Sequence, residues 1–348
     1  MLYKNSVIDT LVFEEADEIL TSSQIEKMLH PLYSRLKLPE GRLELMTGIK
    51  ERRLWRKGVK PSDAATLAGR KALESTSLPI EKMQCLLMCS VCRDFLEPAT
   101  ATVVHHSLSL PDDCLVLDIS NACLGILSGM VLLSEMIDNG RIEAGMLVAG
   151  ESSRALLEST VNMLNNDHNI SRRDVKQHFS SLTIGSGAIA AIIASKNISP
   201  SNHRILGEKT TAYTAHNKLC RGTGDRGMTD ESNVLMNTES ETLMLKGIEA
   251  AADNWERLKT ELSWSNQTPD LVCTHQVGSA HRKILFEKLD LSLDKDFPTF
   301  EKYGNMGTIS CPASLALAMK SERLSPGDKL ALLGIGSGIN CTMIGLEW

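Results

Sequence analysis

Apolar residues in this chain gather in short continuous runs, and between the runs they recur at helical spacing. Short runs bounded by polar or glycine-containing segments predict buried strands. In the first half of the chain, the predicted strands are residues 84–91, 115–119, 146–149 and 186–194. The segment 123–139 is apolar on most sides and is followed by Gly140, which predicts a buried helix with a glycine cap.

Two further helices are predicted from their N-terminal signals. Ser23 and Glu26 have the spacing of a capping box, so we expect a helix that runs from there to about Leu36. Pro61 and the polar residues after it begin a second helix, in which apolar residues recur at helical spacing.

The second half of the chain repeats the pattern of the first. Its predicted strands are residues 271–274, 329–334 and 341–346, and a predicted helix begins at Asn305 and ends near Pro326. Segments 123–153 and 305–338 follow the same order of loop, helix and strand, which indicates an internal duplication.

Alternating strands and helices predict an α/β protein built in layers. The duplication predicts two similar halves, 1–197 and 198–348. We place their boundary in the polar, proline-containing stretch 195–203.

Composition and charge narrow the class of function. The 348 residues carry a net charge of −6, whereas a nucleic-acid binder would first show a basic surplus. The first residues lack the apolar core of a signal peptide, and no run approaches the roughly 20 apolar residues that span a bilayer. We therefore expect a cytoplasmic protein without a membrane span, in which the nine cysteines are reduced thiols.

Cys123 is the first candidate for chemistry, because it stands where a predicted strand meets the N-terminus of a buried helix. Free amides and the helix dipole at such a position lower the pKa of a thiol, and the same amides can hold an oxyanion. A cysteine is more often a small buried hydrophobe, so the position alone leaves both readings open.

Two residues of the second half favour the interpretation of Cys123 as a nucleophile. His275 follows a predicted strand, and Asn305 precedes the duplicated helix, near the counterpart of Cys123. Cysteine with histidine and asparagine is a known nucleophilic constellation. The glycine-rich turn 334–338 adds a backbone that can approach a substrate oxygen closely.

Four motifs occur in one order, at residues 121–123, 275–277, 304–307 and 334–338. With them, nearly the whole chain resembles the Cys-His-Asn condensing enzymes of the thiolase superfamily, most of all the ketoacyl-ACP synthase III group. The resemblance implies a thiolase fold with a duplicated, five-layered αβαβα architecture, assembled as a homodimer. It implies CoA thioester substrates, with no cofactor and no metal.

Within that group the chain resembles the OleA-type enzymes, which join two fatty acyl-CoAs head to head at the start of bacterial long-chain olefin synthesis. The segments that carry this likeness are 53–55, 62–66, 93–98, 217–222 and 336–341, with Trp348. The resemblance implies that Cys123 carries one acyl chain as a thioester. It also implies an oxyanion hole from the amides of Cys123 and Ser337, and an enolate held by His275 and Asn305.

Glu97 separates the subgroups. In OleA-type enzymes the matching glutamate reaches across the dimer and acts as the base on the second acyl chain. A malonyl donor forms its carbanion by losing carbon dioxide, whereas a simple acyl-CoA must lose an α-proton to a base. Without the resemblance, Glu97 would be interpreted as a solvated loop acid. The implied product, after hydrolysis, is a 2-alkyl-3-keto acid.

Two other functions stay open at this point. One is condensation with a malonyl donor, or acyl transfer to a small-molecule acceptor, which needs no Glu97. The other is a catalytically silent subunit, which would need no nucleophile. Fatty acyl-CoA and other olefin-pathway enzymes are the expected partners.

A cluster of cysteines and two groups of basic residues could also bind a ligand. Cys85, Cys89 and Cys92 have the spacing of an iron–sulfur motif, but strand-like apolar residues separate them, so we expect core thiols. Two basic groups could contact CoA phosphates, with Arg53, Lys218 and Arg221 as the chosen candidates. The members of these groups are Lys50, Arg52, Arg53, Arg56 and Lys57, and Lys218, Arg221 and Arg226.

Overall fold

The computed structural model describes residues 1–222 and 235–348, so Arg226 lies outside the described residues. Its strands are β1 Ser6–Glu15, β2 Glu18–Thr21, β3 Glu51–Leu54, β4 Met83–Met88, β5 Leu115–Asp118, β6 Ala144–Glu151, β7 Gly187–Ser195, β8 Arg204–Ala212, β9 Cys220–Gly222, β10 Met236–Thr238, β11 Leu271–Thr274, β12 Lys329–Gly336 and β13 Asn340–Glu347.

The α-helices are α1 Ser22–Met28, α2 His30–Leu36, α3 Arg42–Thr47, α4 Pro61–Ser75, α5 Thr100–Leu108, α6 Gly125–Asp138, α7 Arg154–Asn166, α8 Arg172–His178, α9 Ser240–Leu262, α10 Ser279–Leu289, α11 Phe300–Tyr303 and α12 Ser310–Lys320. Short 3-10 turns are η1 Ile80–Lys82, η2 Ala122–Leu124, η3 Phe179–Leu182, η4 Thr214–His216, η5 Leu293–Lys295 and η6 Gly307–Ile309.

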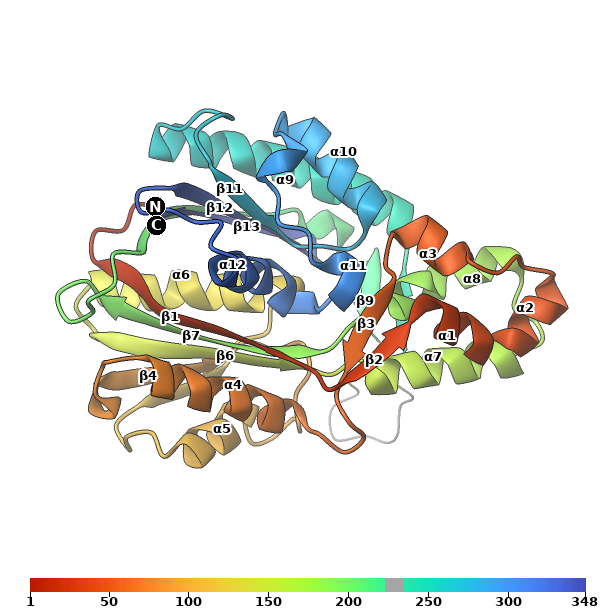
Figure 1. The fold of residues 1–348 in the computed structure, drawn as a ribbon, viewed down its shortest axis with the longest axis horizontal. Coiled ribbons are helices and arrows are strands. Elements are labelled where there is room, and N and C mark those ends of the chain that lie inside the picture. The colour runs from red at the N-terminus through yellow and green to blue at the C-terminus, as the bar shows by residue number, and fades with distance from the viewer. Residues whose placement is uncertain (223–234) are drawn as a thin grey trace.

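The elements stack in five layers, as expected (Figure 1). Helices α9 and α10 cover the outer face of strands β11 to β13, and α4 and α5 cover the outer face of the layer that holds β1, β7, β6 and β4. Helices α6 and α12 lie between the two β layers. Leu127, Leu133 and Leu315 of this central layer are at most 1% exposed. Burying such a side chain contributes roughly 1.5–3 kcal/mol to stability.

The two β layers are joined by hydrogen bonds into one folded sheet, in the order β11-β12-β13-β8-β1-β7-β6-β4-β5. A single pair of residues, Val7 and Arg204, joins β1 to β8. Within this sheet, β1 and β4 to β7 form one layer, and β8 and β11 to β13 form the other. Strands β2 and β3 form a separate two-stranded sheet, as do β9 and β10. The segment between β7 and β8 corresponds to the predicted boundary, and the division into halves 1–197 and 198–348 stays a prediction.

The duplication is visible in the structure as two copies of one unit. The first copy is η2, α6 and β6, and the second is η6, α12 and β12. Each begins with a three-residue 3-10 turn, continues directly into an α-helix and ends in an eight-residue strand.

The predicted capping box at Ser23 and Glu26 is wrong by two residues. Thr21 and Gln24 form the box instead: the Thr21 hydroxyl accepts the N–H of Gln24 at 3.1 Å, and the Gln24 side chain accepts the N–H of Thr21 at 2.8 Å. Thr21 ends β2 with extended backbone, which is the conformation that an N-cap needs. The predicted single helix is broken in two, because Pro31 lies in the first turn of α2.

The predicted strand 84–91 ends earlier, at Met88. The chain leaves the sheet there, and the carboxylate of Glu151 accepts the amides of Val91 and Cys92, at 2.8 and 3.2 Å. Cys85 and Cys89 are buried in one core layer, as expected for core thiols.

All nine cysteines, which lie in the described ranges, are free thiols. Among the residues that the structure describes, no group of three or more His, Cys, Asp or Glu could hold a metal ion. No helix in the described part is both long and apolar enough to cross a membrane.

Candidate active site

The turn η6 lies where residues of both halves meet. Its first residue, Gly307, donates its N–H to Oδ1 of Asn305 at 3.0 Å, and the backbone of Gly307 is hydrogen-bonded to His275. Because Oδ1 of Asn305 is occupied, its amide nitrogen is the group left to donate to a substrate oxygen.

The next residue of the turn reaches the element that carries Cys123. The hydroxyl of Thr308 accepts the N–H of Ile126, near the start of α6, at 2.7 Å. Both groups are buried. Cys123 sits on the turn η2, directly before α6. One tight turn therefore gathers Cys123, His275 and Asn305, although their roles stay predictions.

Backbone geometry sets the position of Cys123. The preceding residue, Ala122, has a φ of 45°, a left-handed conformation that costs a non-glycine residue energy. Asn121 is held from both sides: its side chain donates to Ser128 at 2.9 Å and accepts from Asn340 at 2.9 Å. The residue before the strained Ala122 is thus held by hydrogen bonds to α6 and β13, which limits the positions that Cys123 can take.

The predicted oxyanion hole has a close backbone approach at its centre. A Cβ built on Gly336, which ends β12, would lie 3.6 Å from the backbone nitrogen of Cys123. The amide of Ser337 follows immediately after Gly336. This close approach brings the two amides that were predicted to hold the oxyanion into one region.

The predicted lowering of the Cys123 pKa is wrong. Burial raises the pKa of this thiol to about 12, and the nearby Cys220 and Glu151 add to the rise. The hydrogen bond of its own backbone N–H lowers the pKa by less. Loss of water disfavours the thiolate more than the helix end favours it, so the resting Cys123 is a neutral thiol.

His275 is 5% exposed and stays neutral at physiological pH. Burial lowers its pKa to about 3, with a smaller contribution from His281, and the hydrogen bond with the backbone of Gly307 partly offsets the effect. Its Nδ1 is buried and has no hydrogen-bond partner among the described residues. A neutral imidazole can accept a proton at one nitrogen and donate from the other.

The neighbour of His275 holds the end of the strand in place. Oε1 of Gln276 accepts the amides of Thr299 and Phe300 at 2.6 and 3.0 Å, and its Nε2 donates to the carbonyl of Phe297 at 2.9 Å. Gln276 therefore has a structural role within the 275–277 motif.

Glu97 has no hydrogen bond or ion pair with Cys123, His275 or Asn305 in the described part of the chain. It is exposed, on the segment 89–99 between β4 and α5. Two exposed apolar side chains precede it, Phe95 at 39% and Leu96 at 43%. Hydrogen bonds hold the segment on both sides of Glu97. Before Glu97, the carboxylate of Asp94 accepts from Ser62. After Glu97, the carboxylate of Asp118 accepts the amides of the first turn of α5.

Glu151 is a residue that the sequence reasoning missed. It ends β6, is 5% exposed, and has a pKa that burial raises to about 7 against the lowering effect of its bonds to Val91 and Cys92. A Cβ built on Gly307 would lie 3.7 Å from its carboxyl group. The only signal in the sequence was an acid directly after an apolar run, which equally describes a solvated strand end.

Most of the first basic group is unsuited to phosphate contact. Arg52 is fully buried, which excludes it. Lys50 pairs with Glu301 at 3.0 Å. Arg53 is one-fifth exposed and faces carboxylates of Glu15 and Glu51 at 3.7 and 3.5 Å. The contact predicted for Arg53 finds no support in this geometry.

Of the second basic group, Lys218 and Arg221 are both exposed. Arg221 donates to the side chain of Asn217 at 3.2 Å. Their contacts with CoA stay predictions.

A hollow of about 190 Å³ elsewhere on the surface is strongly basic. Of the described residues that line it, four are cationic and none is acidic. The cationic residues are Lys37, Arg42, Arg172 and Lys176, and the others are Leu38, Pro39, Met46, Val175 and Phe179.

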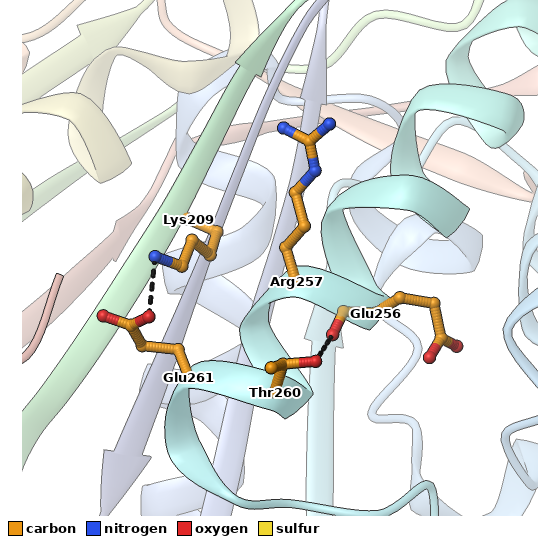
Figure 2. Close-up of a pocket in the computed structure, with 5 residues that line it drawn as sticks. All are labelled: Lys209, Glu256, Arg257, Thr260 and Glu261. Carbon is orange, nitrogen blue, oxygen red and sulfur yellow. Dashed lines mark hydrogen bonds and ion pairs between the residues drawn. The ribbon is translucent and has the colours of Figure 1, made fainter.

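A larger, open hollow of about 430 Å³ lies between β8 and α9 (Figure 2). Its charges are of both signs and partly paired, because Lys209 contacts Glu261 at 2.9 Å. Helix α9 covers the outer face of its β layer, whereas α6, which Cys123 precedes, lies on the inner face (Figure 1). This hollow is therefore separate from the gathered catalytic candidates.

The sequence is similar to known proteins over its whole length. Residues 260–348 match the 3-oxoacyl-[acyl-carrier-protein] synthase III C-terminal family. The chain is 37% identical to an acyl-CoA:acyl-CoA alkyltransferase of Shewanella oneidensis and 35% identical to that of Xanthomonas campestris, with all of each chain covered. It is 24% identical to a β-ketoacyl-[acyl-carrier-protein] synthase III of Oceanobacillus iheyensis, over 87% of this chain and 88% of that one.

The chain is also similar to solved structures over its whole length. The fold is similar to cerulenin-bound Xanthomonas campestris OleA with a TM-score of 0.94 at 34% identity, covering 100% of this chain and 98% of that one. It is also similar to a cysteine-to-serine variant of that OleA with bound lauric acid and lauroyl-CoA, with a TM-score of 0.93 at 35% identity and full coverage of both chains.

Proposed function

Because this chain belongs to the OleA family of acyl-CoA:acyl-CoA alkyltransferases, we propose that it condenses two fatty acyl-CoAs head to head, in the first step of long-chain olefin synthesis. The observation that carries the proposal is the gathering of Cys123, His275 and Asn305 around the turn η6. An intact nucleophile also argues against a silent subunit.

In the first stage, the sulfur of Cys123 attacks the thioester carbonyl of one acyl-CoA. Its pKa of about 12 leaves little thiolate at neutral pH, so the proton must leave as the bond forms. This proton ends on the departing CoA sulfur, so that CoA leaves as the thiol. The amides of Cys123 and Ser337 hold the oxyanion, and removing one such donor typically costs about 10²–10³ in rate.

In the second stage, Glu97 removes an α-proton from a second acyl-CoA. His275, neutral because of its low pKa, and the free amide nitrogen of Asn305 donate hydrogen bonds to the enolate oxygen. The α-carbon attacks the acyl thioester, the bond from the acyl carbon to the sulfur breaks, and the proton taken up by Glu97 ends on that sulfur, so that Cys123 leaves as the thiol. The β-ketoacyl-CoA is then hydrolysed to the 2-alkyl-3-keto acid.

The proposed second stage uses a homodimer, in which the exposed Glu97 of one chain acts at the Cys123 of the other. Strand β5 is at the edge of the sheet, and its alternate residues Leu115 and Leu117 are 44% and 43% exposed. An edge strand with an apolar face favours pairing with another chain. A second copy placed there would cover β5 and also the apolar residues next to Glu97.

The basic hollow is the best-supported place for the phosphates of CoA. Four cations line the hollow, and although Lys176 also pairs with Glu241 at 3.7 Å, this positive surplus favours a polyanion. Phe179 lines the hollow and begins the 3-10 turn η3, while Thr183, one residue past that turn, accepts the N–H of Asn305 at 2.9 Å. At about 2 Å of rise per residue, this path covers only about 8 Å.

The deciding experiment uses lauroyl-CoA as the sole substrate, without any malonyl donor. The expected product is the head-to-head β-keto acid, identified by mass spectrometry. Its absence, together with condensation after malonyl-CoA is added, would establish the synthase III alternative instead.

Glu97→Gln tests the base role within the same assay. Glutamine keeps the size and hydrogen-bonding capacity but cannot accept the α-proton, so this variant should load Cys123 normally and then stall before the carbon–carbon bond forms. Mixing Glu97→Gln chains with Cys123→Ala chains should partly restore activity, since a mixed dimer has one site with both groups. Condensation at the parent rate by Glu97→Gln would refute the base role.

The proposal also includes a cytoplasmic location and an association with other olefin-pathway enzymes. Cell fractionation and co-purification would test these two points.

A further inference from the structure

A buried carboxylate clamps the segment that carries Glu97. Each oxygen of Glu151 accepts one backbone amide, from Val91 at 2.8 Å and from Cys92 at 3.2 Å. The thiol of Cys92 is hydrogen-bonded to the carbonyl of Ser152 at 3.4 Å, so this part of the segment is fixed to the end of β6. Amide bonds to a carboxylate are stronger than bonds between neutral groups.

The same carboxylate faces the gathered residues of the site. Its carboxyl carbon and Oε1 lie 3.7 Å from the place where a Cβ on Gly307 would be. Gly307 is the residue whose N–H orients Asn305. Glu151 also interacts electrostatically with Cys123 and raises its pKa. A single side chain thus lies beside the turn that orients Asn305 and holds the Glu97 segment, and its charge acts on Cys123.

The duplication explains how Glu151 reaches this place. Glu151 is the last residue of β6, and Gly336 is the last residue of β12 in the second copy. Each strand end packs against the turn of the other copy, Glu151 against Gly307 and Gly336 against Cys123. The first copy therefore places a carboxyl group at this strand end, where the second copy has a glycine.

We infer that Glu151 is a positioning residue for condensation: its carboxyl group holds residues 91–92 so that Glu97 is presented correctly, and it lies beside Gly307, which orients Asn305. This inference rests on the proposed function. The reactivity of Cys123 in the free enzyme is a separate readout that needs no substrate.

Glu151→Gln separates these effects. A glutamine has one acceptor oxygen, and its NH₂ group cannot accept the second amide, so one clamp bond is lost. We expect lauroyl-CoA to load Cys123 at the parent rate, while condensation slows by about 10- to 100-fold, the loss typical of one hydrogen bond to a charged group. The matched control is Glu143→Gln, which alters a half-exposed acid just before the same strand.

A second readout is the pH dependence of Cys123 alkylation by iodoacetamide, followed by peptide mass spectrometry. Among the described groups, Cys92 and Cys123 are the thiols whose pKa values Glu151 raises. Removing the charge should shift the alkylation profile of Cys123 to lower pH, so the variant should have a more reactive nucleophile and slower condensation. General damage to the fold would not produce this opposite pair of changes.

Glu151→Asp keeps the charge on a shorter arm, so its alkylation profile should stay close to that of the parent. This variant also serves if Glu151→Gln fails to fold. Parent-like condensation in Glu151→Gln, an unshifted alkylation profile, or an equal loss of loading and condensation would each overturn the inference. If the parent enzyme itself does not condense lauroyl-CoA, the proposed function fails, and the alkylation result stands alone.

Discussion

The two copies of the duplicated unit have the same geometry and different chemistry. Turn η2 begins with Ala122 at a φ of 45°, and turn η6 begins with Gly307 at a φ of 59°. The second position is Cys123 in one copy and Thr308 in the other. Cys123 is half-buried, whereas the hydroxyl of Thr308 is committed to the amide of Ile126.

This difference shows how one scaffold can supply two kinds of part. The first copy contributes the predicted nucleophile, and the second contributes a structural bond and the turn that orients Asn305. Because each copy supports the other, the site exists only where the two halves meet.

The largest effect should come from Cys123 itself. Cys123→Ala removes the only sulfur at the reactive position of the first copy, so no acyl adduct should form when the variant is incubated with lauroyl-CoA. Intact-protein mass spectrometry measures this directly. Cys220→Ser, a change at another half-buried thiol, should still form the adduct. An acyl adduct on Cys123→Ala would show that the nucleophile is assigned to the wrong residue.

The next effect concerns the groups gathered by the second copy. His275→Ala and Asn305→Ala should still load Cys123 but condense about 10²–10³-fold more slowly, because each removes a donor to the enolate oxygen. Single-turnover kinetics with lauroyl-CoA separates loading from condensation. If both variants condense at nearly the parent rate, the enolate is held by other groups.

The smallest effect is on stability and concerns Thr308. Thr308→Val keeps the shape but leaves the buried amide of Ile126 without its acceptor, so the free energy of unfolding should fall by about 1–3 kcal/mol. Denaturant titration measures the change. Thr210→Val, at an exposed position, serves as the control and should stay within about 0.5 kcal/mol of the parent. An equal loss in both variants would mean that the Thr308 bond has no special weight.

Buried strands with continuous apolar runs were predictable from the sequence. The strand β11 was confirmed with its exact bounds, and β7 to within one residue at each end. Strand β1 was missed, although it lies in the middle of the sheet. Its apolar alternation is interrupted at Asp9 and Thr10, where the register shifts. Asp9 is accommodated there because Ser199 and Thr76 each donate to it at 2.6 Å.

The site was predictable only in part, for a physical reason. Cys123, His275 and Asn305 stand next to glycines and strand ends, which local patterns and a family resemblance can identify. The state of the thiol was predicted wrongly, since the helix end was visible in the sequence and the enclosure that raises the pKa was not. Glu151 depends on two amides from a distant segment, and no local pattern indicates such a contact.

The strand end of each copy packs against the turn of the other copy, so a substitution in one copy affects which residues the other can accept. A larger residue at position 307 would meet the carboxyl of Glu151, and a larger residue at position 336 would meet the turn that holds Cys123. Substitutions at 151 and 307, or at 123 and 336, should therefore be strongly non-additive, because neighbours in contact do not change independently. After the duplication, a substitution at one of these contact positions was therefore tolerated only if the residue it meets in the other copy could accommodate it.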